Sequence, residues 1–147
     1  MTLGMTTPLN EMENRIDDLL GITPEEGEAL TERMDDIDEW NWDVNEFVNT
    51  TGEQAFSILG LKLLLYHDVF KHQNYNIHTC ANFLNKLQEG YYESNKFHNV
   101  NHIIDCVHAT HFFFKPAGIE QYLAQSDIPL GFIAAFIHDY EHPGVTN

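Results

Sequence analysis

Five apolar segments with a helical period follow one another between residues 42 and 142, and this pattern constrains the fold more than any other feature of the sequence. They cover residues 42–48, 52–70, 77–92, 99–114 and 126–142. Pro116 and Pro143 stop the last two segments, because proline cannot continue a helix. The sequence contains no Asn-Gly or Asp-Gly pair, which would favour a β-hairpin turn. It also lacks the sustained alternation of apolar and polar residues that is typical of a β-strand. The sequence therefore predicts an all-α multi-helix bundle.

The N-terminal part of the chain differs from the rest in charge. The first 46 residues carry most of the formal net charge of −16. Thr23 as N-cap, Pro24 at the first helical position and Glu26 as capping-box partner predict the start of an acidic helix. We expect the residues before Thr23 to form a flexible leader. Residues 1–39 are thus predicted to be an acidic leader and helix, partly flexible, and residues 40–147 to be a separate folded part.

Charge and hydropathy also indicate which classes of binding partner and which cellular compartment to expect. An acidic chain repels phosphate backbones and anionic lipid, so we expect neither nucleic acid nor a membrane surface as partner. No apolar run reaches 18 residues, and the N-terminus lacks the pattern of a signal peptide. Two cysteines, Cys80 and Cys106, are too few for a disulfide framework. We therefore expect a soluble protein of the reducing cytoplasm.

Four histidines lie within residues 97–111, "FHNVNHIIDCVHATH". If this stretch is helical, His98, His102 and Asp105 fall within about 60° of one another at about 100° per residue. We expect Asp105 to orient a metal-bound histidine rather than to bind the metal itself. Cys106 lies in the same stretch and could ligate zinc, but no Cys-x-x-Cys spacing supports that role.

The other histidines divide into two sets. His108 and His111 rotate off the His98 stripe, and we expect them to be structural. His67, His72 and His78 are expected to be solvated or hydrogen-bonded surface residues, because histidine is commonly satisfied without a metal.

A second histidine-rich stretch closes the last apolar segment. His138, Asp139, Tyr140, Glu141 and His142 stand directly before a Pro-Gly turn. The negative end of the helix dipole favours a cation at this position. An imidazole next to a carboxylate is a common set of ligands for a divalent metal, and a carboxylate can bridge two metals. The sequence therefore predicts a metal site at the end of this segment.

Together these stretches resemble the catalytic domain of the class I cyclic-nucleotide phosphodiesterases. "FHNVNH" with "DCVHATH", and about thirty residues later "AAFIHDYEHPGVTN", are similar to the family motifs Tyr-His-Asn-x-x-His and His-Asp-x-Asp/Glu-His-x-Gly-x-x-Asn. The likeness extends weakly upstream to about residue 40. It implies that residues 40–147 are the N-terminal part of a phosphodiesterase catalytic domain, a truncated helical bundle of the His-Asp metallophosphohydrolase type.

The resemblance also implies a reaction and a role for each motif residue. The reaction is hydrolysis of the 3′ phosphoester of cyclic AMP or cyclic GMP, in signal transduction, with two divalent metals, zinc and either magnesium or manganese. His98 would be the general acid. The first metal would be bound by His102, His138 and Asp139, and Asp139 would also reach the second. Three further residues would lie outside the first coordination sphere: Asn99, Asp105 and His142.

The sequence departs from the family pattern at two positions. Phe97 replaces the usual tyrosine, and Pro129 stands where an acidic residue is common at a helix start. Neither change affects an implied metal ligand, and proline is tolerated in a first helical turn.

The resemblance also implies residues that follow the second motif: a further aspartate ligand, a glutamine that binds the purine and an aromatic clamp. The 147 residues do not include them, so we expect this chain alone to hydrolyse cyclic nucleotides poorly or not at all. Residues 61–70 and 129–137 are apolar around most of a helix. We therefore expect them to pack against helices that this chain does not contain, or to expose apolar surface and self-associate.

Two alternatives remain open. One is a non-catalytic chain that binds a metal or a full-length partner. The other is a His-Asp phosphohydrolase with a non-cyclic substrate.

Overall fold

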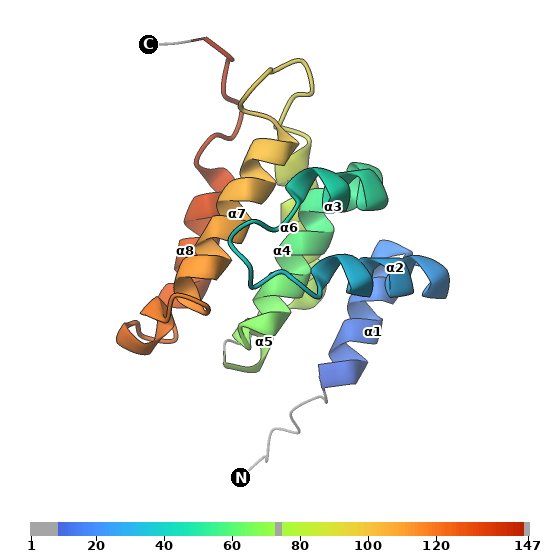
Figure 1. The fold of residues 1–147 in the computed structure, drawn as a ribbon, viewed down its shortest axis with the longest axis vertical. Helices are drawn as coiled ribbons and strands as arrows, with labels where there is room; N and C mark the ends of the chain where they lie inside the picture. The colour runs from blue at the N-terminus through green and yellow to red at the C-terminus, as the bar shows by residue number, and fades with distance from the viewer. Residues whose placement is uncertain (1–8, 73–74, 146–147) are drawn as a thin grey trace.

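A computed structural model describes residues 9–72 and 75–145, and within these ranges the regular structure is entirely helical. In chain order the elements are α1 (Leu9–Leu20), α2 (Pro24–Met34), α3 (Val44–Thr51), the 3-10 turn η1 (Gly52–Gln54), α4 (Ala55–Tyr66), α5 (Val69–His72), α6 (Ile77–Gln88), α7 (Val100–Phe114), the 3-10 turn η2 (Ile119–Tyr122) and α8 (Asp127–Ile137). The predicted all-α bundle is confirmed (Figure 1).

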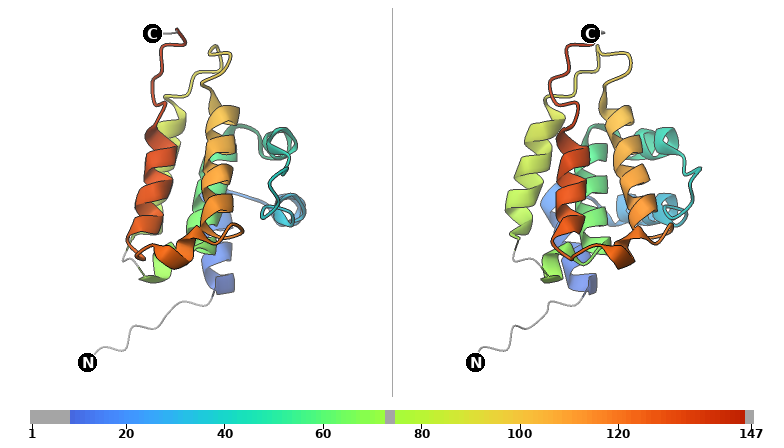
Figure 2. Two further views of the ribbon diagram at one scale, coloured as in Figure 1. Left: turned by 60° about the vertical axis from the view of Figure 1, so that its left-hand side comes forward. Right: turned by 90° about the vertical axis from the view of Figure 1, so that its left-hand side faces the viewer.

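Helix α4 is the central helix of the bundle. Helices α6, α7 and α8 run alongside it, and α1 packs on another side (Figure 2). All residues of α4 except Lys62 and Tyr66 are buried. A helix that is apolar all round belongs in a core, and here four helices of the same chain cover it. We expected residues 61–70 to pack against helices outside this chain; for the part of that range in α4, helices of the same chain supply the packing instead.

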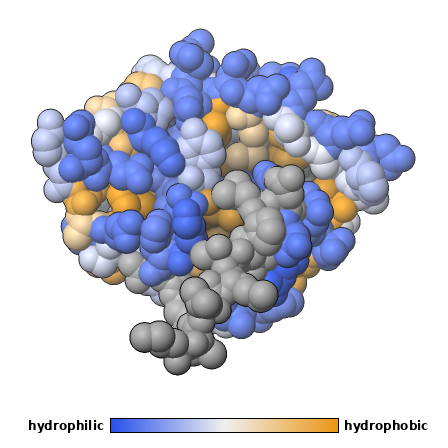
Figure 3. Space-filling view, turned by 90° about the horizontal axis from the view of Figure 1, so that it is seen from below, coloured by the Kyte–Doolittle hydropathy of each residue, from blue (hydrophilic) through white to orange (hydrophobic). Residues whose placement is uncertain are grey.

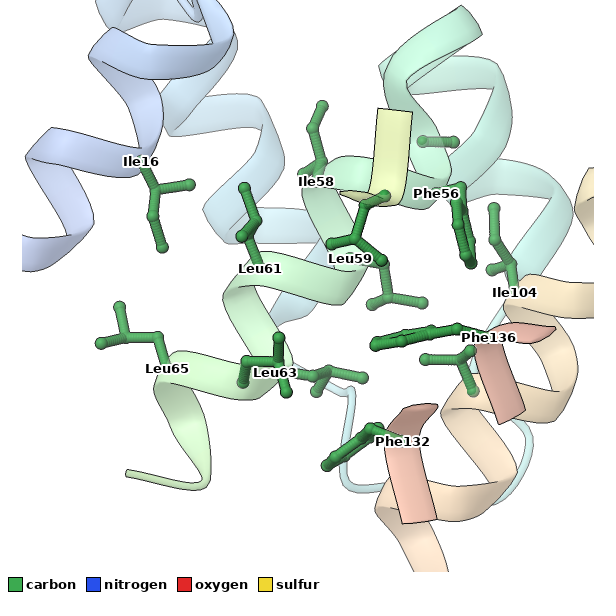
Figure 4. Packing of buried hydrophobic residues seen from close by; sticks show 14 of the residues in the cluster. Ile16, Phe56, Ile58, Leu59, Leu61, Leu63, Leu65, Ile104, Phe132 and Phe136 are labelled. Atoms are coloured by element: carbon green, nitrogen blue, oxygen red, sulfur yellow. The ribbon is translucent and has the colours of Figure 1, made fainter. Parts of the chain in front are cut away.

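The aromatic residues of α8 pack against α4. Figure 4 shows Phe132 and Phe136 of α8 pointing toward α4. The rings of Phe136 and Phe56 lie 5.5 Å apart, edge to face, a favourable geometry for two aromatic rings. Burying each phenylalanine stabilises the bundle by about 1.5–3 kcal/mol. These contacts hold the C-terminal end of α8 against the N-terminal end of α4.

The N-terminal region is more ordered than its sequence suggested. The helix start at residue 24 is confirmed, since the Thr23 backbone N–H donates to Glu26 Oε2 at 2.8 Å and Thr23 Oγ1 accepts from the Glu26 N–H. The flexible leader is wrong for residues 9–20, which form α1, while residues 1–8 lie outside the described residues. Ile16 is fully buried and faces Leu61 and Leu65 of α4 (Figure 4).

Helix α1 folds because its apolar residues share one face. Met12, Ile16, Leu19 and Leu20 follow the helical period and pack on the core. Lys62 of α4 pairs with Asp17 at 2.7 Å, which adds an ionic contact to this interface.

Apolar surface remains in several places on the described part of the chain. Leu130 and Ile137 of α8 are 59% and 44% exposed. Between α4, α6 and α8 lies a pocket of about 260 Å³ with a wholly apolar lining that includes Cys80, Phe83 and Ile133. Apolar patches also show at the lower end of the bundle (Figure 3). None of the described helices is long and apolar enough to cross a bilayer.

Candidate metal centre

The candidate site lies where α7 begins and α8 ends. These two helices run antiparallel, so the first turns of α7 and the last turn of α8 meet at the upper end of the bundle (Figure 1). His102 is in the first turn of α7, and His138 is the C-cap residue of α8. Their ring centroids lie 5.5 Å apart, although 35 residues separate them in the sequence. The two sequence motifs thus form one cluster in space.

One carboxylate oxygen is the centre of that cluster. Asp139 Oδ2 lies 2.7 Å from His98 Nδ1, 3.1 Å from His102 Nε2 and 3.3 Å from His138 Nε2. Burial acts to raise the pKa of Asp139, but the His98 hydrogen bond and the nearby histidines outweigh it and lower that pKa below its ordinary value. Asp139 is therefore ionised at neutral pH, as a metal ligand must be.

The loop before α7 is held to the segment after α8 by Asn95, which the sequence reasoning missed. Its Oδ1 accepts from the backbone N–H of Phe97 and of His98, at 3.3 and 3.1 Å. Its Nδ2 donates to the His142 carbonyl at 3.2 Å. Asparagine commonly binds backbone groups two or three residues further on, so its place in "SNKFHN" was an available signal. Asn95 is buried and fixes the backbone of His98 relative to that of His142.

Asn99 is the N-cap of α7. Its side chain accepts from the backbone N–H of Asn101 and of His102 and donates to the Asn95 carbonyl at 3.0 Å. It therefore fixes the residue at which α7 begins, and with it the position of His102 in the first turn.

The predicted stripe of His98, His102 and Asp105 does not form. His98 precedes the N-cap and is not part of the helix, so the helical spacing does not apply to it. Asp105 is exposed and makes no hydrogen bond with either histidine in the described part of the chain. Cys106 lies beside His102 instead, with Sγ 3.8 Å from Nε2, because i and i+4 share a helix face.

Among the residues that the structure describes, the potential ligands form two groups of three. One consists of His102, Cys106 and His138, and the other of His98, Asp139 and His142. Within each group the donor atoms lie within 4.8 Å of one another. Imidazole, thiolate and carboxylate are ligands of divalent metals such as zinc, so the donor set fits a metal of this kind. Burial, with the charges of Asp105 and Asp139, raises the pKa of the Cys106 thiol.

Aromatic and apolar residues border this cluster. The His98 and His142 rings stack with centroids 3.7 Å apart, and the Phe97 ring lies 4.6 Å from that of His102. An open pocket of about 790 Å³ adjoins His98 and His142, with Tyr92 and Phe97 in its lining. Pro129 is buried in the first turn of α8, away from the cluster.

The histidines expected to be structural lie elsewhere. His108 Nε2 bonds the Ile37 carbonyl at 3.0 Å, and His111 Nε2 bonds Asp38 at 2.8 Å. The prediction that His67 lies at the surface is wrong, because the residue is 5% exposed and its ring packs against Phe132. Its Nε2 lies 2.9 Å from His111 Nδ1.

Burial disfavours the charged form of these internal rings. It lowers the pKa of His67 to about 3 and also lowers the pKa values of His108 and His111. His72 and His78 are exposed, as expected.

Comparisons with known proteins agree with both motifs. The family model described as 3′5′-cyclic nucleotide phosphodiesterase matches residues 97–147, of which 146 and 147 lie outside the described structure. The human dual specificity calcium/calmodulin-dependent 3′,5′-cyclic nucleotide phosphodiesterase 1C is 30% identical over 120 residues, which is 81% of this chain and 17% of that protein.

A second human relative is the high affinity cAMP-specific and IBMX-insensitive 3′,5′-cyclic phosphodiesterase 8A. It is 30% identical over 118 residues, which is 80% of this chain and 14% of that protein. The chain thus spans about a sixth of the length of the curated relatives it matches. With both motifs and these matches, the chain belongs to the class I 3′,5′-cyclic nucleotide phosphodiesterase family.

Proposed function

We propose that this chain carries the metal-binding and acid-bearing part of a phosphodiesterase site that hydrolyses the 3′ phosphoester of cyclic AMP, cyclic GMP or both, giving the 5′-nucleotide in cytoplasmic signal transduction. The main support is the position of Asp139, whose carboxylate oxygen lies within 3.3 Å of nitrogens from three histidines of both motifs. Family membership supports the substrate class.

The first metal, which we propose to be zinc, would be held by His102, His138 and Asp139, and Asp139 would also reach a second metal, magnesium or manganese. When bound, such metals neutralise phosphate charge and lower the pKa of a coordinated water. The two imidazoles come from different helices, so closing the site depends on the packing of α7 against α8. The carboxylate of Asp139 has a second oxygen, and it can therefore bind a metal while keeping its contact with His98.

His98 is proposed to protonate the departing 3′ oxygen. Its Nδ1 is occupied by Asp139, so Nε2 is the nitrogen left for proton transfer. The hydrogen bond to Asp139 and the stacked ring of His142 restrict the orientation of the His98 imidazole. In this proposal His142 positions the ring of His98, and Asn99, as the N-cap of α7, positions the backbone of His102.

The nucleotide is proposed to enter the pocket beside His98. The volume of about 790 Å³ is within the range of small-molecule sites, and Phe97, which is 63% exposed, offers an aromatic surface.

A second candidate function is metal binding without turnover by this chain. The observation that favours it is the coverage of the relatives, of which the chain matches 17% or less. In this case the metal site would form, but the residues that grip the base would be missing and the phosphate would not be oriented.

The purified 147-residue chain can test both functions. We expect it to retain zinc in equilibrium dialysis, and His102→Ala and His138→Ala to retain less. His78→Ala, on the exposed face of α6, is the matched control. Equal zinc retention by all four proteins would refute the metal site.

Hydrolysis of cyclic AMP and cyclic GMP is then assayed by chromatography, with zinc and magnesium present. Turnover would assign the phosphodiesterase reaction to these 147 residues and overturn the second candidate. Zinc retention without turnover is the result expected of this chain alone, and it fits both candidates.

A further inference from the structure

Cys106 lies next to the proposed ligands of the first metal. Its Sγ is 3.8 Å from His102 Nε2 and 3.9 Å from His102 Nδ1. With His138 Nε2 or Nδ1 it completes a group of donor atoms that all lie within 4.8 Å of one another. This group does not include His98 or His142, which form the other set with Asp139.

The local structure favours convergence of these three side chains. His102 and Cys106 are four residues apart on α7, so they project from the same face of the helix. Two ligands at this spacing can reach one metal ion, as in other helical zinc sites. His138 reaches the same place from the end of α8, and its ring lies 5.5 Å from that of His102.

The distance between Cys106 Sγ and His102 Nε2 is close to that between two ligands of one zinc ion. Zinc lies about 2.0–2.1 Å from imidazole nitrogen and about 2.3 Å from thiolate sulfur, which puts nitrogen and sulfur ligands about 3.5 Å apart. The observed 3.8 Å between Cys106 Sγ and His102 Nε2 is only slightly longer.

We propose that Cys106 is a thiolate ligand of the first metal, beside His102 and His138. The proposal rests on the function proposed above, because it concerns the same metal site. On binding, the bond between sulfur and metal forms, and the thiol proton leaves to solvent. Thiolate ligands favour zinc over magnesium, so Cys106 makes this position selective for a softer ion.

Cobalt(II) provides a direct test, because a bond between thiolate and cobalt absorbs in the near ultraviolet and imidazole or carboxylate ligands produce no such band. We expect the 147-residue chain to bind cobalt with this band. Cys106→Ser should lose the band but still bind cobalt through the remaining ligands. Cys80→Ser is the matched control, since Cys80 is the only other cysteine and lines the apolar pocket on α6; this variant should keep the band.

Alkylation supplies a second measurement that does not depend on the serine variants folding. Zinc should slow the reaction of Cys106 with iodoacetamide in the unmodified chain and leave that of Cys80 unchanged, as followed by peptide mass spectrometry.

The possible outcomes are distinct. If the chain binds cobalt without the near-ultraviolet band, or if the band persists in Cys106→Ser, Cys106 is not a ligand. Either result would still be consistent with the metal site of the proposed function. Equal protection of both cysteines would likewise show that Cys106 is not a ligand. If the unmodified chain retains neither cobalt nor zinc, the metal site of the proposed function fails as well.

Discussion

The imidazole of His98 and the carboxylate of Asp139 lie 2.7 Å apart, although their positions in the sequence differ by 41. This contact joins the loop before α7 to the segment after α8. It also pairs the proposed general acid with a proposed metal ligand, and so the two roles can be separated by mutation.

In a form of the protein that turns over cyclic nucleotides, His98→Ala should slow turnover by about 10²- to 10⁴-fold, because a general acid is lost. Its metal content should be unchanged. Asp139→Ala should lower metal content as well as turnover. Steady-state kinetics and metal analysis of the same samples measure both, with His72→Ala, at an exposed site, as control. Equal metal loss in the first two variants would refute this division of roles.

Asn95→Ala should weaken zinc binding by about 10- to 100-fold, a typical effect of losing a residue that supports metal ligands. The change leaves two backbone N–H groups and the His142 carbonyl without their partner. Loss of such bonds at a buried site costs about 1–3 kcal/mol of stability. Competition with a zinc chelator measures the affinity. Asn82→Ala, on the exposed face of α6, should change neither quantity, and matching effects from both variants would contradict a role for Asn95.

Ile16→Ala should lower the free energy of unfolding by about 2–4 kcal/mol, because it removes a fully buried side chain from the contact between α1 and α4. Urea unfolding followed by circular dichroism gives the value. Arg15→Ala changes the neighbouring exposed residue and should have an effect below about 0.5 kcal/mol. Identical unfolding midpoints for the two variants would mean that α1 contributes no packing energy.

Stability should fall as the pH drops below about 6.5, the ordinary pKa of histidine. Burial lowers the folded-state pKa of His67 to about 3, so the unfolded chain binds more protons between these two values. The free energy of unfolding should therefore decrease on acidification by up to about 1.4 kcal/mol per pH unit for this residue. His111, Lys115, Asp38 and Glu120 are the charged or titratable groups around it.

Urea unfolding between pH 6.5 and pH 5 tests this dependence, since most carboxylates stay ionised in that window. His67→Gln should flatten the pH dependence, whereas His78→Gln, at an exposed position, should not. A slope that is the same in both variants and the unmodified chain would rule out His67 as the source.

Local sequence patterns were enough to predict the helices and the principal histidines. Apolar periodicity and proline stops indicated α3, α4, α6, α7 and α8, although not the turn η2 or the separation of η1 and α5 from α4. The capping box of Thr23 and Glu26 located the start of α2. These signals act within one or two helical turns and need no tertiary contact. The motif residues His98, His102, His138 and Asp139 could likewise be named in advance, and the structure brings them together.

Tertiary structure decided the features that depend on where elements start and what covers them. Asn99 caps α7 one residue after His98, so His98 lies outside the helix and does not share a stripe with His102 and Asp105. His67 is buried because α8 covers it with Phe132. Whether a polar residue faces solvent, a core or a metal depends on packing between segments far apart in the chain, and periodicity within one segment carries no information about that packing.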